Sequence, residues 1–229
     1  MKLAIMQPYL FPYLGYFQLI RAADSFVVYE DVNYIKGGWI NRNFILNRHE
    51  KQLITLPLQG GSPNRTIAQI TIGGRRGKLL ETIRHSYSRA PHFDAVFPMV
   101  EDILLQQEEN LARFLDYGLR RVCEYLGLHP AWHISSELDK DPSLHGQDKV
   151  LALCAAVGAT HYINTPGGRA LYDRQAFAQS GIQLSFIQPR SVSYRQFGEG
   201  FVGNLSIIDV MMFNPSSQCA ALLEEYDLD

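Results

Sequence analysis

Apolar and polar positions in the N-terminal part of the chain follow two different periods. Residues 2–6 form an apolar run without alternation, which is typical of a strand buried on both faces of a sheet. Residues 13–23 place apolar side chains at helical spacing, and residues 24–32 are rich in β-branched and aromatic side chains. A strand, a short helix and a strand within this length predict a parallel pair, with the first strand central in the sheet.

The middle of the chain predicts a hairpin followed by helices. Two strand-like segments, 39–46 and 51–58, flank a polar turn, and residues 66–72 add a further strand. From residue 77 to residue 128 the apolar spacing is helical and is interrupted twice, which predicts three helices.

Strand and helix patterns alternate again in the C-terminal part. Strands are expected at 131–135, 160–164 and 182–189, and helices at 147–158, 167–180, 205–214 and 217–226. Such alternation predicts an α/β, Rossmann-like and mostly parallel sheet with a β-hairpin and a helical insertion. We expect a single domain, residues 1–229, in which residues 74–128 form the helical insertion or subdomain.

Composition narrows the class of protein. The 229 residues are 46% hydrophobic and 19% charged, with a formal net charge of -2, which argues against a broad nucleic-acid surface. No apolar stretch approaches the roughly 20 residues that span a bilayer. Three widely spaced cysteines and the lack of a signal-peptide pattern lead us to expect a cytoplasmic protein. His129 and His133 have no third ligand nearby, so no metal is expected; the oligomeric state stays open.

The loop after the first strand is the first candidate for binding. Ligands of open α/β sheets bind at the carboxyl ends of strands, so Gln7 and Tyr9 are expected to contact substrate. Tyr13 and Tyr16, in "YLGY", have the spacing of the H-x-G-H signature of nucleotidyl-transfer enzymes. This spacing suggests that the two tyrosines contact the phosphates of ATP or of another acyl-activating nucleotide. The alternative is that both tyrosines only pack the helix on the sheet.

A polar, aromatic and glycine-containing segment follows the second strand and is typical of a recognition loop. Cationic side chains there suit phosphate or carboxylate, and amides suit hydroxyl groups. The alternative is a polar turn with a salt bridge from Asp31 to Lys36. The candidates are Asp31, Tyr34, Lys36, Trp39, Asn41, Arg42 and Asn43.

A third candidate segment surrounds "NTPGG", between a strand and a helix. Asn164, Gly167, Gly168 and Arg169 could form an anion site there, or the glycines could serve only the turn. Lys149 is placed in the first helical turn, where a cation opposes the helix dipole, and this cost suggests a role in binding.

Four long motifs together resemble the WbqC-like family of bacterial proteins. They are "QPYLFPYLGYFQLI", "DVNYIKGGWINRN", "HYINTPGGRALYD" and "LSIIDVMMFN", and the resemblance runs from residue 3 to about residue 214. Members often belong to O-antigen or surface-polysaccharide gene clusters. The resemblance implies transfer of glycine or another aminoacyl group to an amino sugar, and it names no catalytic residue. The chain departs at Gly37, where relatives commonly carry a larger polar residue.

Two functions are therefore expected. In the first, an enzyme transfers an activated acyl or aminoacyl group to the amine of a sugar or nucleotide-sugar, through an acyl-adenylate if the first loop binds ATP. Lys36, Arg42, Lys149 and Arg169 would neutralise charge. Asp31 would orient or deprotonate the amine. In the second, the chain is a non-catalytic module that binds a nucleotide-sugar or glycan. Turnover separates the two.

Overall fold

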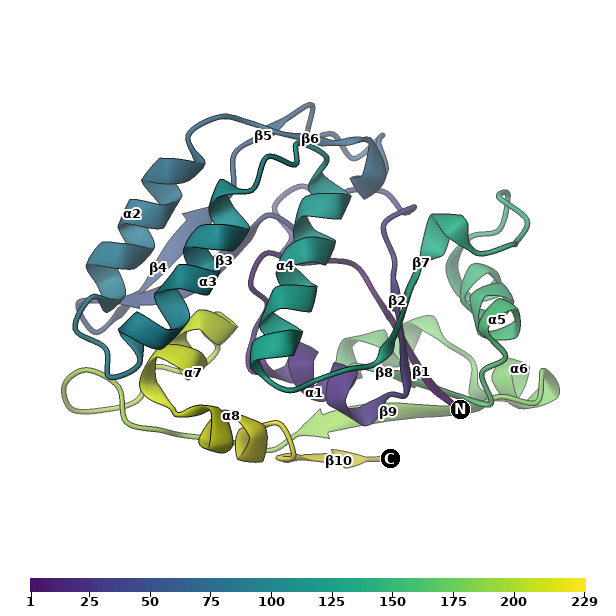
Figure 1. Ribbon diagram of the computed structural model, residues 1–229. Coiled ribbons are helices and arrows are strands. Elements are labelled where there is room, and N and C mark those ends of the chain that lie inside the picture. Colours follow the sequence, from purple (N-terminus) through teal and green to yellow (C-terminus); the bar gives the residue numbers. More distant parts are fainter.

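A six-stranded sheet forms one half of the molecule in the computed structural model, which describes all residues 1–229. Its order is β10-β9-β8-β1-β2-β7, and only the edge strand β10 is antiparallel (Figure 1). The strands are β1 (Lys2–Met6), β2 (Ser25–Val28), β7 (Ala131–Ile134), β8 (His161–Asn164), β9 (Gln183–Pro189) and β10 (Tyr226–Leu228).

The expected parallel pair and the central first strand are confirmed. Leu3 pairs with Ser25 on β2 and with Tyr162 on β8, so β1 has a parallel neighbour on each side. Helix α1 (Leu14–Ala22) connects β1 to β2. The α/β fold class with a mostly parallel sheet follows from this arrangement.

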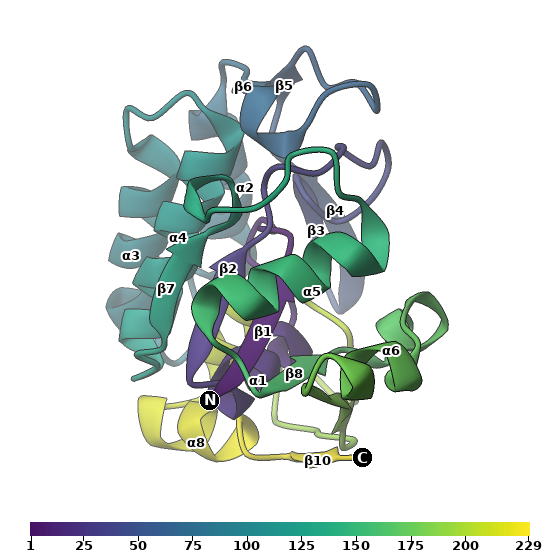
Figure 2. The same ribbon diagram turned by 90° about the vertical axis from the view of Figure 1, so that its right-hand side faces the viewer.

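Each face of the sheet has its own apolar core, because side chains alternate along every strand. Leu3, Ile5 and Leu184 pack with residues of α5 (Gly146–Val157) and α6 (Arg174–Gln179). Figure 2 shows these two helices in front of the sheet. Ala4 and Phe26 face the opposite way, into a larger core with α1, α7 (Ile207–Phe213) and α8 (Ser216–Leu222).

The segment between β2 and β7 builds the other half of the molecule. Hairpin strands β3 (Arg42–Asn47) and β4 (Glu50–Thr55) pair antiparallel, as do β5 (Leu58–Gln59) and β6 (Thr71–Ile72). The three expected helices are present as α2 (Arg76–Tyr87), α3 (Phe93–Leu105) and α4 (Leu111–Tyr125). Their apolar faces belong to the same continuous core as α1 and α7.

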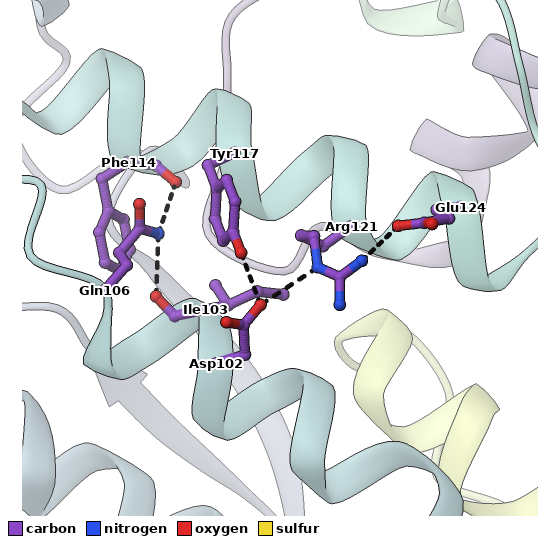
Figure 3. A network of polar contacts seen from close by, with 7 residues as sticks. All are labelled: Asp102, Ile103, Gln106, Phe114, Tyr117, Arg121 and Glu124. Atoms are coloured by element: carbon purple, nitrogen blue, oxygen red, sulfur yellow. Dashed lines mark hydrogen bonds and ion pairs between the residues drawn. The ribbon is translucent and has the colours of Figure 1, made fainter.

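A polar network joins α3 to α4 on the surface (Figure 3). Asp102 Oδ2 accepts hydrogen bonds from Tyr117 Oη at 2.6 Å and from Arg121 Nε at 3.1 Å, and Arg121 also pairs with Glu124. Because Asp102 and Arg121 are roughly half exposed, this network orients the helices more than it stabilises them.

A buried carboxylate connects the helices to the C-terminal segment. Asp209, on α7, accepts hydrogen bonds from Tyr87 Oη at 2.9 Å, Tyr194 Oη at 2.8 Å and Gln196 Nε2 at 2.6 Å. The Tyr87 hydroxyl in turn accepts from the backbone N–H of Leu46 at 2.9 Å. Burial raises the pKa of Asp209, and no cation is paired with it, so neutral donors satisfy this carboxyl group.

Three sequence predictions of local structure were wrong. Instead of a strand over 66–72, a 3-10 turn (Ile67–Gln69) precedes the short β6, because Thr66 and Gln69 form a capping box. Instead of one helix over 167–180, a 3-10 segment (Pro166–Leu171) ends before α6, which restarts at the cap Asp173. The last helix ends at Leu222, and β10 follows it. None of the helices combines the length and the hydropathy that a bilayer crossing requires.

Candidate functional site

The carboxyl edge of the sheet contains a topological switch point beside β1. The chain passes from β1 to β2 and β7 on one side, and later to β8 and β9 on the other. In open α/β sheets this reversal opens a crevice in which ligands bind. The loops that begin at Gln7, Tyr29 and Thr165 all leave the sheet at this edge.

The first of these loops is fixed by neighbours far away in the sequence. Asn43 Nδ2 donates to the Phe11 carbonyl at 2.6 Å, and the Ser206 hydroxyl donates to the same oxygen at 2.9 Å. Tyr16 Oη donates to the Gln7 carbonyl at 2.8 Å. Phe11 has a φ of 42°, a left-handed conformation that costs energy and persists because these donors hold its carbonyl. These hydrogen bonds hold the loop in a defined shape.

An open pocket of about 300 Å³ lies between this loop and the β3–β4 hairpin. We call it the aromatic pocket. It is lined by Tyr9, Pro12, Tyr13, Trp39, Asn43, Phe44, Lys51 and Asn204. The Trp39 and Phe44 rings are 5.7 Å apart, and Trp39 and Tyr13 remain 47% and 41% exposed. Large aromatic side chains this accessible on a fixed loop are typical of a binding surface.

The polar groups of the aromatic pocket are two tyrosine hydroxyls, two asparagine amides and one cation. Burial, and to a smaller extent the neighbouring Tyr13, raises the pKa of Tyr9 to about 12. Burial also raises the pKa of Tyr13, so both hydroxyl groups stay protonated at neutral pH. Lys51 places its ammonium 5.9 Å from the Phe44 ring centre. The pocket can thus offer hydroxyl donors, aromatic faces and a positive charge to a ligand.

Gly15 allows the Tyr13 ring to lie against the first turn of α1. A Cβ at residue 15 would be 2.5 Å from Tyr13 Cε2, so any larger residue would displace the ring. On the far side of Tyr13 lies a second groove of about 390 Å³, between α1 and the segment after β9. Tyr13 and Asn204 line both hollows, so the two adjoin.

Asp31 and Lys149 meet away from the aromatic pocket, in what we call the lysine–aspartate cluster. Asp31 Oδ2 lies 3.0 Å from both Lys140 Nζ and Lys149 Nζ, and its Oδ1 accepts from the Ser135 hydroxyl at 2.6 Å. Lys149 also donates to the Asp31 carbonyl at 2.8 Å. Burial of Asp31 favours its neutral form, but the hydrogen bonds from Ser135, Lys149 and Lys140 outweigh burial and lower its pKa. The cluster joins the end of β2 to β7 and α5.

Arg42 supports its own loop. Its Nε donates to the Gly38 carbonyl at 2.9 Å, its Nη2 donates to the Gly37 carbonyl, and its guanidinium lies 5.6 Å from the Trp39 ring centre. The Nη1 group has no hydrogen-bond partner within the chain. Lys36 is exposed on the same loop.

The neighbouring amides have protein partners as well. Tyr34 Oη donates to Asn41 Oδ1 at 2.8 Å, and Asn41 Nδ2 donates to the Leu56 carbonyl at 2.8 Å. Both residues are buried. The Asn41 bond joins the recognition loop to the residue after β4, whereas Asn43 joins β3 to the first loop. Together they position Trp39 at the mouth of the aromatic pocket.

The segment after β8 forms a third group. Asn164 Oδ1 accepts from the Thr165 N–H at 2.7 Å. Its Nδ2 lies so close to Gly168 that a Cβ at residue 168 would be 2.5 Å from it, so a larger residue would displace the amide. Arg169 pairs with Asp229 and lies over the Phe186 ring. Gly167 is exposed. The aromatic pocket takes residues from the first two loops and none from this segment.

Sequence reasoning identified Tyr9, Tyr13, Trp39 and Asn43 as candidates, and the structure brings them together. It did not name Pro12, Phe44, Lys51 and Asn204 as candidates. Phe44 and Lys51 share a face of the hairpin, a placement that depends on strand register, because Leu46 pairs with Lys51. Asn204 comes from a loop far along the chain, and no local signal marks it.

Comparisons with known proteins match nearly the whole length of the chain. A model of the WbqC-like protein family matches residues 7–221. A relative named "Uncharacterized protein Rv1507c", from Mycobacterium tuberculosis (strain ATCC 25618 / H37Rv), is 29% identical over 222 residues, which is 95% of each chain. No solved structure matches.

Proposed function

The chain belongs to the WbqC-like protein family, and from this premise we propose that it transfers an acyl or aminoacyl group, such as glycine, to an amino sugar or nucleotide-linked amino sugar. The reaction would be a cytoplasmic step of surface-polysaccharide synthesis. The observation that carries the proposal is the aromatic pocket with its accessible Trp39, Tyr13 and Phe44. The C–H faces of a sugar, or the flat face of a nucleotide base, pack against such rings.

The two adjoining hollows support a reaction with two substrates. The sugar would occupy the aromatic pocket and the activated acyl group the groove beyond Tyr13. Their reacting groups would meet beside Tyr13 and Asn204, so that catalysis would consist mainly of positioning. The amine attacks the activated carbonyl carbon, the amide bond forms, the leaving group departs with its electron pair, and the amine proton passes to solvent.

Charge neutralisation is assigned to the recognition loop and to Lys51 on β4. The free Nη1 of Arg42, the exposed Lys36 and the ammonium of Lys51 could contact a phosphate on a nucleotide-sugar or on ATP. Asp31 and Lys149 are paired with each other, so their catalytic or binding role would require ligand to displace that pairing. ATP is one acyl-activating nucleotide that fits the proposal.

A second candidate is a non-catalytic module that binds a nucleotide-sugar or glycan. One observation favours it, namely that no carboxylate or histidine lines the aromatic pocket to act as a general base. Both candidates share the binding site and differ in turnover.

The test is to incubate the protein with a nucleotide-linked amino sugar and either acyl-CoA or ATP plus glycine, and to detect the amide by mass spectrometry. We expect Trp39→Ala to weaken sugar binding about 5- to 100-fold, the scale of one stacking contact. Leu105→Ala is the control, because Leu105 on α3 is also 47% exposed and lies outside the pocket. Binding of the nucleotide-linked amino sugar without amide formation supports the module, and no binding of that sugar overturns both candidates.

A further inference from the structure

A wide basic cavity lies at the end of the molecule opposite α5 and α6. The turn between β3 and β4, the end of α2 and the loop after Gln196 meet there (Figure 1). The cavity measures about 970 Å³, and its lining includes Arg48, His49, His85 and Arg89. We call it the basic cavity. It shares no lining residue with the aromatic pocket or the adjoining groove.

Every titratable side chain that lines the basic cavity is basic, and none of them takes part in an ion pair. Arg84, which directly precedes His85 on α2, is by contrast paired with both Glu81 and Glu101. Arg48 and Arg89 therefore keep all their guanidinium donors for a ligand from outside the chain. Two guanidinium groups facing one hollow suit the oxygens of a phosphate group.

The backbone that presents Arg48 and His49 is strained. Both have positive φ, 47° and 68°, in the two-residue turn of the β3–β4 hairpin. Such turns strongly favour Asn and Gly, because other side chains are disfavoured in the left-handed region. An Arg-His pair in this turn lowers the stability of the fold, and strained backbone conformations occur preferentially at functional sites.

The loop after Gln196 fixes the turn in place. His49 Nδ1 lies 2.8 Å from the Phe197 carbonyl oxygen. Gly198 has a φ of 75°, and a Cβ there would be 2.4 Å from His49 Cε1, so only glycine lets the loop approach the imidazole this closely. The basic cavity is thus pre-formed from three separate segments.

A structural explanation exists for only part of this arrangement. His85 and Arg89 lie near the end of α2, where a positive charge is favourable to the helix dipole. That explanation covers neither Arg48, which is on the hairpin turn, nor the strain at residues 48 and 49.

We propose that the basic cavity binds a phosphate group of a phosphorylated ligand, either a soluble pyrophosphate ester or the headgroup of an anionic lipid. This site is separate from the aromatic pocket and does not depend on the transfer reaction. Arg48 and Arg89 hold the phosphate oxygens, and His49 fixes the turn that presents Arg48.

The experiment measures binding of inorganic pyrophosphate by calorimetry and of vesicles that contain phosphatidylglycerol by sedimentation. The test variant is Arg48→Ala/Arg89→Ala. The control is Arg65→Ala/Arg113→Ala, which removes the same charge from two exposed arginines that are in no ion pair and do not line the cavity. Equal melting temperatures of the variants and the parent show that all are folded.

We expect the test variant to bind at least one probe tenfold or more weakly than the parent, while the control stays within twofold. The probe that responds identifies the source of the phosphate. The proposal is overturned if the parent binds neither probe, if the test variant binds as the parent does, or if the control loses as much affinity, since the last result would reflect net charge alone.

Discussion

Replacing Lys149 by methionine should destabilise the fold measurably. The Lys149 side chain is only 7% exposed, its ammonium is 3.0 Å from Asp31 Oδ2, and it donates to the Asp31 carbonyl at 2.8 Å. Methionine keeps the length of the side chain and removes the charge. Breaking a fully buried ion pair costs about 3–5 kcal/mol, but here Asp31 keeps Lys140 and Ser135 and is 21% exposed.

We therefore expect Lys149→Met to lower the free energy of unfolding by about 2 kcal/mol, the scale of a hydrogen bond to a charged group. For a chain of this size the melting temperature should fall by roughly 4–8 °C. Urea unfolding monitored by circular dichroism measures the change, and Lys78→Met, at an exposed lysine on α2, is the control. Unchanged or increased stability would refute the reasoning, and would mean that Lys149 is buried for the sake of a ligand rather than the fold.

Three further predictions use urea unfolding, and the second also uses pyrophosphate binding. Tyr87→Phe should lower the free energy of unfolding by about 3 kcal/mol, because it leaves a buried N–H and the Asp209 carboxyl group each without one partner. Tyr117→Phe, in the exposed network, should lower it by less than about 1 kcal/mol. Equal losses for the two variants would contradict this reasoning. Arg48→Asn should stabilise the hairpin turn by about 1 kcal/mol and weaken pyrophosphate binding, and lower stability would argue against strain. The pKa of Asp31 is lowered from 3.8 in the folded state, so ionised Asp31 stabilises the fold above pH 3.8. This stabilisation should be lost as the pH falls through the lower pKa of the folded state. An Asp31→Asn variant with the same acid dependence as the parent would refute this prediction.

Much of the sheet could be predicted from the sequence because its strands are continuous apolar runs. The interior of β1 has no charge and no alternation, and this pattern indicated a strand with neighbours on both sides. The segment 66–72 was harder to interpret, since its β-branched residues suggest a strand. The Thr66–Gln69 capping box was visible in the sequence and decides the local structure in favour of a turn.

The aromatic pocket could be predicted only in part. Tyr13 was a candidate because of its spacing from Tyr16 around Gly15, and Trp39 because it lies in a segment crowded with glycine, charged and amide residues. Candidates on the other segments lie outside the pocket, since Arg169 pairs with Asp229 and Asp31 with two lysines. The partner of a charged side chain is determined by the tertiary structure. Because Asp31 and Lys149 are far apart in the sequence, no local sequence pattern predicts that they pair.

Fluorescence of Trp39 tests the central claim most directly. The chain has two tryptophans, so a Trp132→Phe variant reports from the aromatic pocket alone. Titration of this variant with a nucleotide-linked amino sugar should give a saturable change in Trp39 emission, with the same dissociation constant that calorimetry measures. Binding detected by calorimetry without any change in Trp39 emission would contradict the account and place the sugar elsewhere on the protein.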